Sequence, residues 1–256
     1  MLSLLSPAKS LDFESSLPLH TGTDLLFEAE ALFINKQLRK KSSSDLMELM
    51  HISEALANLN LERNRSFDLE DEALERRAAI FAFDGDVYKG LDANSLSEQD
   101  LKHAQNRLLI LSGLYGLLRP FDLILPYRLE MGTKITIGDS KNLYGYWKEK
   151  LTQTVNSIVE EQGHEFIVNL ASKEYAKALD FNALNAKIVD IDFKEFRNGK
   201  LKVISFNAKR ARGGMARQIV KNRIESVEAL KDCVVDGYKF DEKGSMENKL
   251  LFIKNE

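Results

Sequence analysis

Three short apolar runs in this sequence each end in small and polar residues that could bind an anion or transfer a proton. The residues at these ends are Ser6 and Lys9 after residues 1–5, Ser112, Gly113 and Tyr115 after residues 108–111, and Asn169 and Ser172 after residues 166–168. In open α/β sheets, ligands bind just beyond the carboxyl ends of the strands. We therefore expect these segments to form one composite site.

Lys9 is the best single candidate for chemistry. A lysine at a strand end that is partly shielded from water can act as a base or a nucleophile, and it can equally serve as a plain phosphate ligand. Ser6 and Ser112 could be nucleophiles, but no histidine stands beside either in the sequence. A Ser-His-Asp triad is therefore not supported.

Residues 112–134 are dense in charged and aromatic side chains. Arginines there could hold phosphate in a two-pronged grip, tyrosines could stack on a base, and acids could orient the arginines or act as general acid/base groups. The residues concerned are Arg119, Arg128, Tyr115, Tyr127, Asp122 and Glu130. The alternative is a rigid loop held by internal ion pairs. We favour a functional role, because the segment leaves the end of a predicted strand.

A second charged segment is basic and contains no acid. It runs from residue 209 to residue 223, and its basic residues are Lys209, Arg210, Arg212, Arg217, Lys221 and Arg223. Gly213 and Gly214 within it are expected to open a helix, where backbone N–H groups and the helix dipole favour an anion. The segment is either a phosphate-binding surface or a solvated basic face.

Residues 44–65 resemble a helix-hairpin-helix, a motif whose tight turn binds phosphate without reading bases. His51 and Ser53 stand where the motif has glycines, which opposes a turn with positive φ. Ser53 can compensate as the N-cap of the second helix. Basic residues flank the unit, which suits a duplex backbone. The alternative is an ordinary helical hairpin packed by Leu46, Leu49, Ile52, Leu56 and Leu59.

The elements that must position these residues alternate along the chain. Apolar periodicity predicts helices over 24–39, 70–81, 97–106, 142–161 and 213–225, a helix–turn–helix-like unit over 44–60, and strands over 1–5, 107–112, 165–170, 187–193, 201–207 and 249–254. Asn198-Gly199 predicts a hairpin turn between two of these strands. We expect an α/β to α+β fold with a mixed central sheet, as one domain over residues 1–256.

Composition narrows the class of protein. The chain has 256 residues, a net charge of −3, and no apolar run long enough to span a membrane. A single cysteine, Cys233, excludes an internal disulfide, and with no signal peptide this favours the cytoplasm. The scattered histidines argue against zinc or iron–sulfur sites, and we expect no cofactor. Asp84 and Asp86 could hold Mg²⁺ through water but more readily cap a turn.

Several blocks in order along the chain resemble the bacterial peroxide stress resistance protein YaaA family. The blocks are residues 6–9, 85–90, 112–120, 126–131, 169–172 and 209–213. The resemblance implies a role in surviving hydrogen peroxide by limiting free iron and the damage that iron does to DNA. It also implies binding of double-stranded DNA through a basic cleft and a helix-hairpin-helix.

Three functions stay open at this point. In the first, the cleft binds duplex DNA phosphates through Lys9, Arg119, Arg128, Arg210, Arg212 and Arg217 together with the turn at His51 and Ser53. In the second, an enzyme binds a nucleotide or a modified nucleobase at the strand ends, with Lys9 as the reactive group; residues 112–118 faintly resemble a motif of proteins of modified-nucleoside metabolism. In the third, the same segments only stabilise loops or bind a protein partner.

Overall fold

The central sheet joins strands that lie far apart in the sequence. A computed structural model describes residues 1–19 and 21–255, and His20 lies outside the described residues. The eight-stranded sheet has the order β11-β12-β9-β8-β1-β5-β6, with β10 paired to β9. Strands β12, β9, β8, β1 and β5 run parallel, whereas β6, β10 and β11 pair antiparallel with their neighbours. The predicted mixed sheet is therefore confirmed.

The sheet strands are β1 (Leu2–Leu5), β5 (Leu108–Ser112), β6 (Gly116–Leu118), β8 (Phe166–Asn169), β9 (Lys187–Arg197), β10 (Lys200–Lys202), β11 (Lys239–Phe240) and β12 (Lys249–Lys254). Two short ribbons pair β2 (Ser10–Leu11) with β4 (Phe83–Asp84) and β3 (Arg77–Ala78) with β7 (Leu123–Ile124). The helices are α1 (Glu28–Leu38), α2 (Ser43–Met50), α3 (Glu54–Ser66), α4 (Ala79–Ala82), α5 (Asp86–Leu91), α6 (Glu98–Ala104), α7 (Leu143–Gln162), α8 (Lys173–Ala176), α9 (Ser205–Lys221) and α10 (Val227–Lys231).

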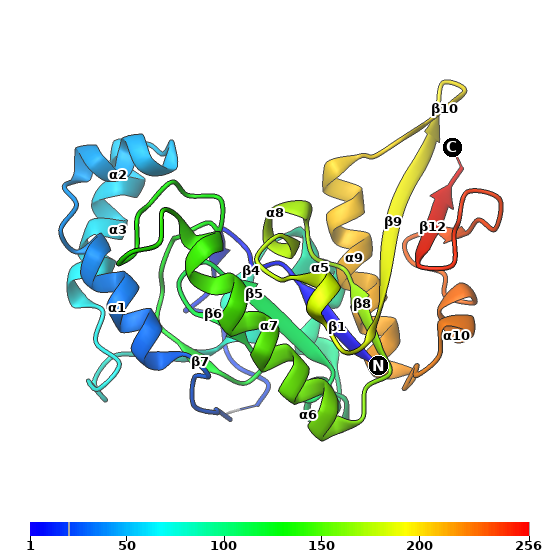
Figure 1. Cartoon of the computed structure of the whole chain (residues 1–256), viewed down its shortest axis with the longest axis horizontal. Coiled ribbons are helices and arrows are strands. Elements are labelled where there is room, and N and C mark those ends of the chain that lie inside the picture. Colours follow the sequence, from blue (N-terminus) through cyan, green and yellow to red (C-terminus); the bar gives the residue numbers. More distant parts are fainter. Residues whose placement is uncertain (20, 256) are drawn as a thin grey trace.

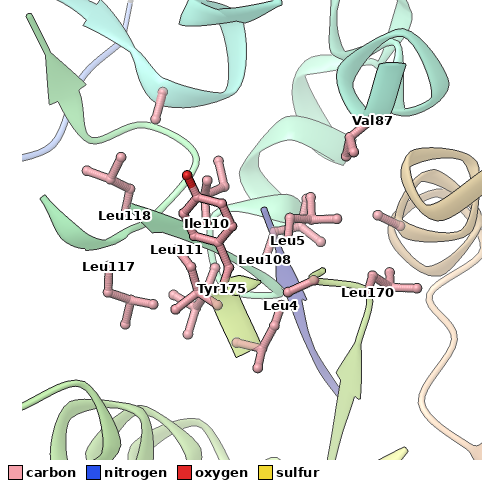
Figure 2. Close-up of a cluster of buried hydrophobic side chains, with 14 of the residues drawn as sticks. Leu4, Leu5, Val87, Leu108, Ile110, Leu111, Leu117, Leu118, Leu170 and Tyr175 are labelled. Carbon is pink, nitrogen blue, oxygen red and sulfur yellow. The ribbon is translucent and has the colours of Figure 1, made fainter. Parts of the chain in front are cut away.

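The core is built around β1. Every residue of β1 and of β5 is buried, which is the pattern of a central parallel strand covered on both faces. Figure 2 shows Leu4 and Leu5 of β1 beside Leu108 and Ile110 of β5, with Leu170 nearby. Helices α1, α2 and α3 gather at one end of the molecule, and β9, β12 and α10 lie at the other (Figure 1).

Most of the predicted elements are confirmed. The strands over 1–5, 107–112, 165–170, 187–193 and 249–254 and the helices over 24–39, 97–106 and 142–161 appear within a few residues of their expected bounds. Asn198 and Gly199 adopt positive φ, of 52° and 71°, in the turn between β9 and β10. This is the geometry of a tight two-residue hairpin turn.

The predicted helix over 70–81 is wrong except for its last residues. The Asp68 and Asp71 carboxylates accept hydrogen bonds from the backbone N–H groups of Glu70 and Ala73, at 2.9 Å each. Such local bonds hold the chain in turns and compete with a helix. Residues 77 and 78 then pair with β7, and only α4 is helical.

The predicted strand over 201–207 ends at Lys202, and the helix expected from 213 starts at Ser205. Buried Ala208, Ala211, Met215 and Ile219 continue one apolar stripe at helical spacing through this region. The stripe begins before the glycine pair, so Gly213 and Gly214 lie inside α9 and not at its start.

His164 is a buried histidine next to two cations. Its Nδ1 lies 3.2 Å from the Met1 ammonium nitrogen and 2.9 Å from Arg107 Nη1. Burial, together with these two charges, lowers the pKa of His164 to about 4. The native imidazole therefore stays neutral at pH values at which a solvated histidine, with a pKa of about 6.5, becomes charged.

The free energy of unfolding should therefore decrease on acidification. As the pH falls from about 6.5 to about 4, the unfolded chain binds a proton at His164 that the native chain does not. We expect a loss of about 1–2 kcal/mol between about pH 7 and about pH 5, measured by urea unfolding. His164→Gln should be less stable at pH 7 but should lack this part of the pH dependence. An equal loss in both proteins would contradict the role given to His164.

Candidate functional site

The ends of β1 and β8 meet. The two strands are parallel neighbours, so their carboxyl ends lie at the same edge of the sheet. The backbone N–H of Ser172 donates to the Ser6 hydroxyl oxygen at 2.8 Å, and the Tyr88 hydroxyl donates to the Ser6 carbonyl oxygen at 3.1 Å. These bonds fix the two strand ends against each other and against α5.

A hollow of about 470 Å³ opens at these strand ends, and we call it the strand-end hollow. It is lined by residues that follow β1 and β8, by the start of α5, by Glu130 and by α9. The lining residues are Ser6, Pro7, Ala8, Lys9, Ser10, Asp84, Gly85, Asp86, Val87, Lys89, Glu130, Ser172, Glu174, Tyr175, Lys209 and Arg212. Of the segments predicted to converge, the structure thus brings together those around Lys9, Ser172 and Arg212.

Helices α5 and α9 cross at very close range through glycines. A Cβ atom on Gly213 would lie 1.7 Å from the Val87 carbonyl oxygen, and one on Gly90 would lie 2.0 Å from the Arg210 carbonyl oxygen. The expectation that Gly213 and Gly214 present free N–H groups to an anion is therefore wrong. Gly213 and Gly90 instead let two backbones touch, which places Lys89 of α5 and Lys209 and Arg212 of α9 around one hollow.

The charges that line the strand-end hollow are of both signs, and some are already paired. Lys9 Nζ lies 2.8 Å from Glu130 Oε2, and Arg128 Nη2 lies 3.3 Å from Glu130 Oε1. The Lys9 side chain is 64% exposed, so the shielding from water expected for a reactive lysine is absent. Glu174 Oε1 accepts the Gly132 N–H at 2.9 Å. Glu130 and Glu174 are thus occupied by neighbouring groups.

Three cations of the strand-end hollow lack an ionic partner. Within residues 1–19 and 21–255, no carboxylate oxygen lies within 4.0 Å of the charged nitrogens of Lys89, Lys209 or Arg212. Arg212 is partly buried, and burial lowers the pKa of its guanidinium, an effect that Asp192 partly opposes. An arginine stays protonated under such conditions, so Arg212 is an unpaired positive charge at the wall of the hollow.

A second hollow of about 570 Å³ adjoins the first, and we call it the hairpin hollow. Its lining comes from the turn between α2 and α3 and from the loop 130–134: Lys41, Asp45, Glu48, Leu49, Met50, His51, Glu130, Gly132, Thr133, Lys134 and Glu174. Glu130 and Glu174 line both hollows. The turn after α2 and the first half of α9 therefore border two adjoining hollows that share these two residues, and we call the two hollows together the cleft.

The turn between α2 and α3 is tight without glycine. His51 ends α2 with a φ of 53°, in the left-handed region, and Ser53 caps α3 by accepting the Leu56 N–H at 3.4 Å. Leu46, Met50 and Ala57 form a small core of their own beneath the turn. Leu56 and Leu59, expected to pack the hairpin, are instead 40% and 41% exposed.

The segment after β5 does not reach the cleft. Ser112, Gly113 and Tyr115 are buried, the Ser112 hydroxyl bonds the Tyr127 hydroxyl at 2.6 Å, and the Trp147 indole donates to the Gly113 carbonyl oxygen at 3.0 Å. Tyr115 as a whole residue is 1% exposed. Stacking of Tyr115 or Tyr127 on a ligand would require the core to open, and these residues do not line the hollow.

Arg119 and Asp122 form an internal ion pair. Arg119 Nε donates to Asp122 Oδ1 at 2.9 Å, and Arg119 Nη2 donates to the Asp24 carbonyl oxygen at 2.6 Å. Asp122 is fully buried, and burial raises the pKa of its carboxyl group. The arrangement matches the alternative of a rigid loop held by its own charges.

Other cations of the α9 segment are also held internally. Arg217 donates to the Leu91 and Asp92 carbonyl oxygens at 2.9 and 2.7 Å. Arg210 lies 3.3 Å from Asp236, and Arg223 lies 2.8 Å from Asp100. Of the basic segment, only Lys209 and Arg212 line the cleft.

Asn169, at the end of β8, is also engaged within the protein. Its side-chain amide donates to the Asp190 carboxylate at 2.7 Å.

Sequence reasoning missed Glu174 and Tyr175, which line the strand-end hollow directly after Ser172. Their position just past a strand end was the available signal.

Among the described residues, no three His, Cys, Asp or Glu side chains are grouped so that they could hold a metal ion. Nor does any helix in this part of the chain have the length and apolar character needed to cross a membrane.

The chain is similar along its whole length to known bacterial proteins. The family model described as peroxide stress protein YaaA matches residues 1–244. A UPF0246 protein of Alteromonas mediterranea is 46% identical over 256 residues, covering 100% of this chain and 99% of the relative. A UPF0246 protein of Flavobacterium johnsoniae is 46% identical over 254 residues, covering 99% and 100%. The chain belongs to the peroxide stress protein YaaA family.

Proposed function

We propose that this protein binds double-stranded DNA through the phosphate backbone, without sequence preference, and so limits iron-driven damage to DNA under peroxide stress. The observation that carries the proposal is that the two hollows adjoin and share Glu130 and Glu174 in their linings. The turn between α2 and α3 and Lys209 of α9 border these adjoining hollows, so a single duplex could contact both.

The hairpin side of the cleft offers the kind of contact that a phosphate backbone accepts. His51 and Ser53 are exposed at the turn, and Lys41 and Lys134 line the adjoining hollow. Backbone N–H groups at a tight turn and flexible lysines contact phosphates but carry no information on base sequence. Arg39, which flanks the hairpin, instead donates to the Asn64 and Phe67 carbonyl oxygens and is not counted among these contacts.

The α9 side contributes Lys209 and, across the hollow, Lys9. Carboxylates in the cleft repel phosphate, but Asp45 is engaged by the Ser42 cap and Glu130 by two cations. The contacts should therefore come from a few unpaired or exchangeable lysines. Such binding is non-specific and strongly dependent on salt.

Cys233 is poorly suited to direct reduction of peroxide. Burial raises the pKa of its thiol to about 11, and the sulfur lies 3.7 Å from the Ala229 carbonyl oxygen. The thiolate is the form that attacks a peroxide, and at neutral pH this thiol is almost entirely protonated.

The test is a salt titration of duplex binding by fluorescence anisotropy, with two duplexes of unrelated sequence. If about four phosphates are neutralised, affinity should fall about 100-fold between about 50 and about 200 mM salt, equally for both duplexes. Binding that does not change with salt, or that is confined to one sequence, would refute the proposal.

A further inference from the structure

The strand-end hollow lies where the direction of the sheet reverses. The chain passes from β1 to β5 on one side, and then crosses back to β8 on the other side of β1. In open sheets this reversal opens a crevice at the carboxyl ends of the strands, in which small ligands bind. Ser6 and Ser172 follow two of those strands, so the crevice and the hollow coincide.

We propose that the strand-end hollow binds a nucleoside monophosphate unit, with the Arg212 guanidinium as the main phosphate ligand. Its phosphate ligands, Arg212 and Lys89, are not among the backbone contacts proposed above, although Lys9 and Lys209 line the same hollow. Its volume of about 470 Å³ falls in the range of about 300–1,000 Å³ typical of small-ligand sites.

Arg212 is the side chain best suited to the phosphate. It lines the hollow, is partly buried, and has no carboxylate within 4.0 Å among the described residues. A guanidinium presents a planar pair of donors that matches two phosphate oxygens. Lys89, which also lacks an ionic partner there, lines the same hollow and could complete the phosphate site.

The remainder of the lining fits a nucleoside. Pro7, Ala8, Val87 and Tyr175 supply apolar surface, and Val87 and Tyr175 are buried. Asp84 and Asp86 supply acceptors for hydroxyl or amino groups, and neither has a cation within 4.0 Å in the described parts of the chain. A ligand with an anionic end, an apolar body and hydrogen-bond donors satisfies all three kinds of surface at once.

Isothermal titration calorimetry of the full chain tests the site with two probes. The first probe is a mixture of the free 5′-monophosphates AMP and GMP. The second is a single-stranded oligonucleotide that carries a 5′-phosphate. Arg212→Gln should weaken whichever probe binds by about 10- to 100-fold, as expected for loss of a charged hydrogen bond. Lys221→Gln, farther along α9, should leave binding unchanged. Circular dichroism verifies folding, and if Arg212→Gln does not fold, Lys89→Gln provides the same contrast.

Binding of free AMP or GMP supports the site and identifies a free nucleotide as its ligand. Binding of the phosphorylated strand alone, with the same loss in the variant, supports the site with a strand end as the source of the nucleotide. Absence of saturable binding by either probe, or equal binding by the Arg212→Gln variant, overturns the proposal. Duplex binding that depends on salt would stand in either case, because it uses other lysines.

Discussion

Replacing Gly213 by alanine should destabilise the native state more than other single-methyl additions in this chain. The new Cβ would lie 1.7 Å from the Val87 carbonyl oxygen and 2.7 Å from the Leu91 nitrogen. Both obstacles are backbone atoms of α5, so no side chain can rotate out of the way. Overpacking of this kind costs about 1–3 kcal/mol and occasionally more, and we expect at least about 3 kcal/mol in urea unfolding.

Gly145→Ala is the matched control for this change. Gly145 also lies in a helix, and the nearest atom to its Cβ position is Asn142 Oδ1 at 3.7 Å. Alanine stabilises a helix interior by about 1 kcal/mol relative to glycine, so this variant should be as stable as the parent or slightly more stable. If Gly213→Ala were as stable as Gly145→Ala, the close crossing of α5 and α9 would be incorrect.

Reversing single charges on the two sides of the cleft should weaken duplex binding by similar amounts. Lys41→Glu lies on the hairpin hollow and Lys209→Glu on the strand-end hollow. Each lost phosphate contact should reduce affinity about tenfold at about 0.1 M salt and lower the salt slope by about 0.9. Anisotropy titrations measure both quantities.

Lys221→Glu is the control for charge reversal on the same helix. Residue 221 follows residue 209 by twelve positions in α9, which is about 18 Å along the helix axis. We expect its affinity for duplex to stay within about twofold of the parent, since long-range charge effects are screened over about 10 Å at 0.1 M salt. Equal losses in all three variants would mean that net charge, and not the cleft, determines binding.

The rule that ligands bind beyond the carboxyl ends of strands predicted part of the candidate site from sequence, because β1 and β8 are parallel neighbours. It failed for β5, whose carboxyl end turns back at once into β6. Gly116, with a φ of 68°, begins β6 directly after the turn, and Trp147 covers it, so that a Cβ there would lie 2.6 Å from the indole. The apolar residues after Ser112 were the signal that this segment stays in the core.

The glycines of α9 show why the remainder could not be predicted. A glycine pair next to basic residues suits both an anion-binding helix start and a close helix crossing. Only the position of α5, more than a hundred residues earlier in the chain, distinguishes the two. In the same way, Arg210 and Arg217 read as free cations until their partners Asp236 and Leu91 are placed in space.

Lysine acetylation with and without bound duplex, read by mass spectrometry, tests most directly whether one cleft receives the phosphate backbone. Duplex should protect Lys41 and Lys134 on the hairpin side together with Lys9 and Lys209 on the α9 side, while Lys221 stays as reactive as in the free protein. Protection restricted to one of the two hollows, or spread equally to Lys221, would contradict a continuous DNA-binding cleft.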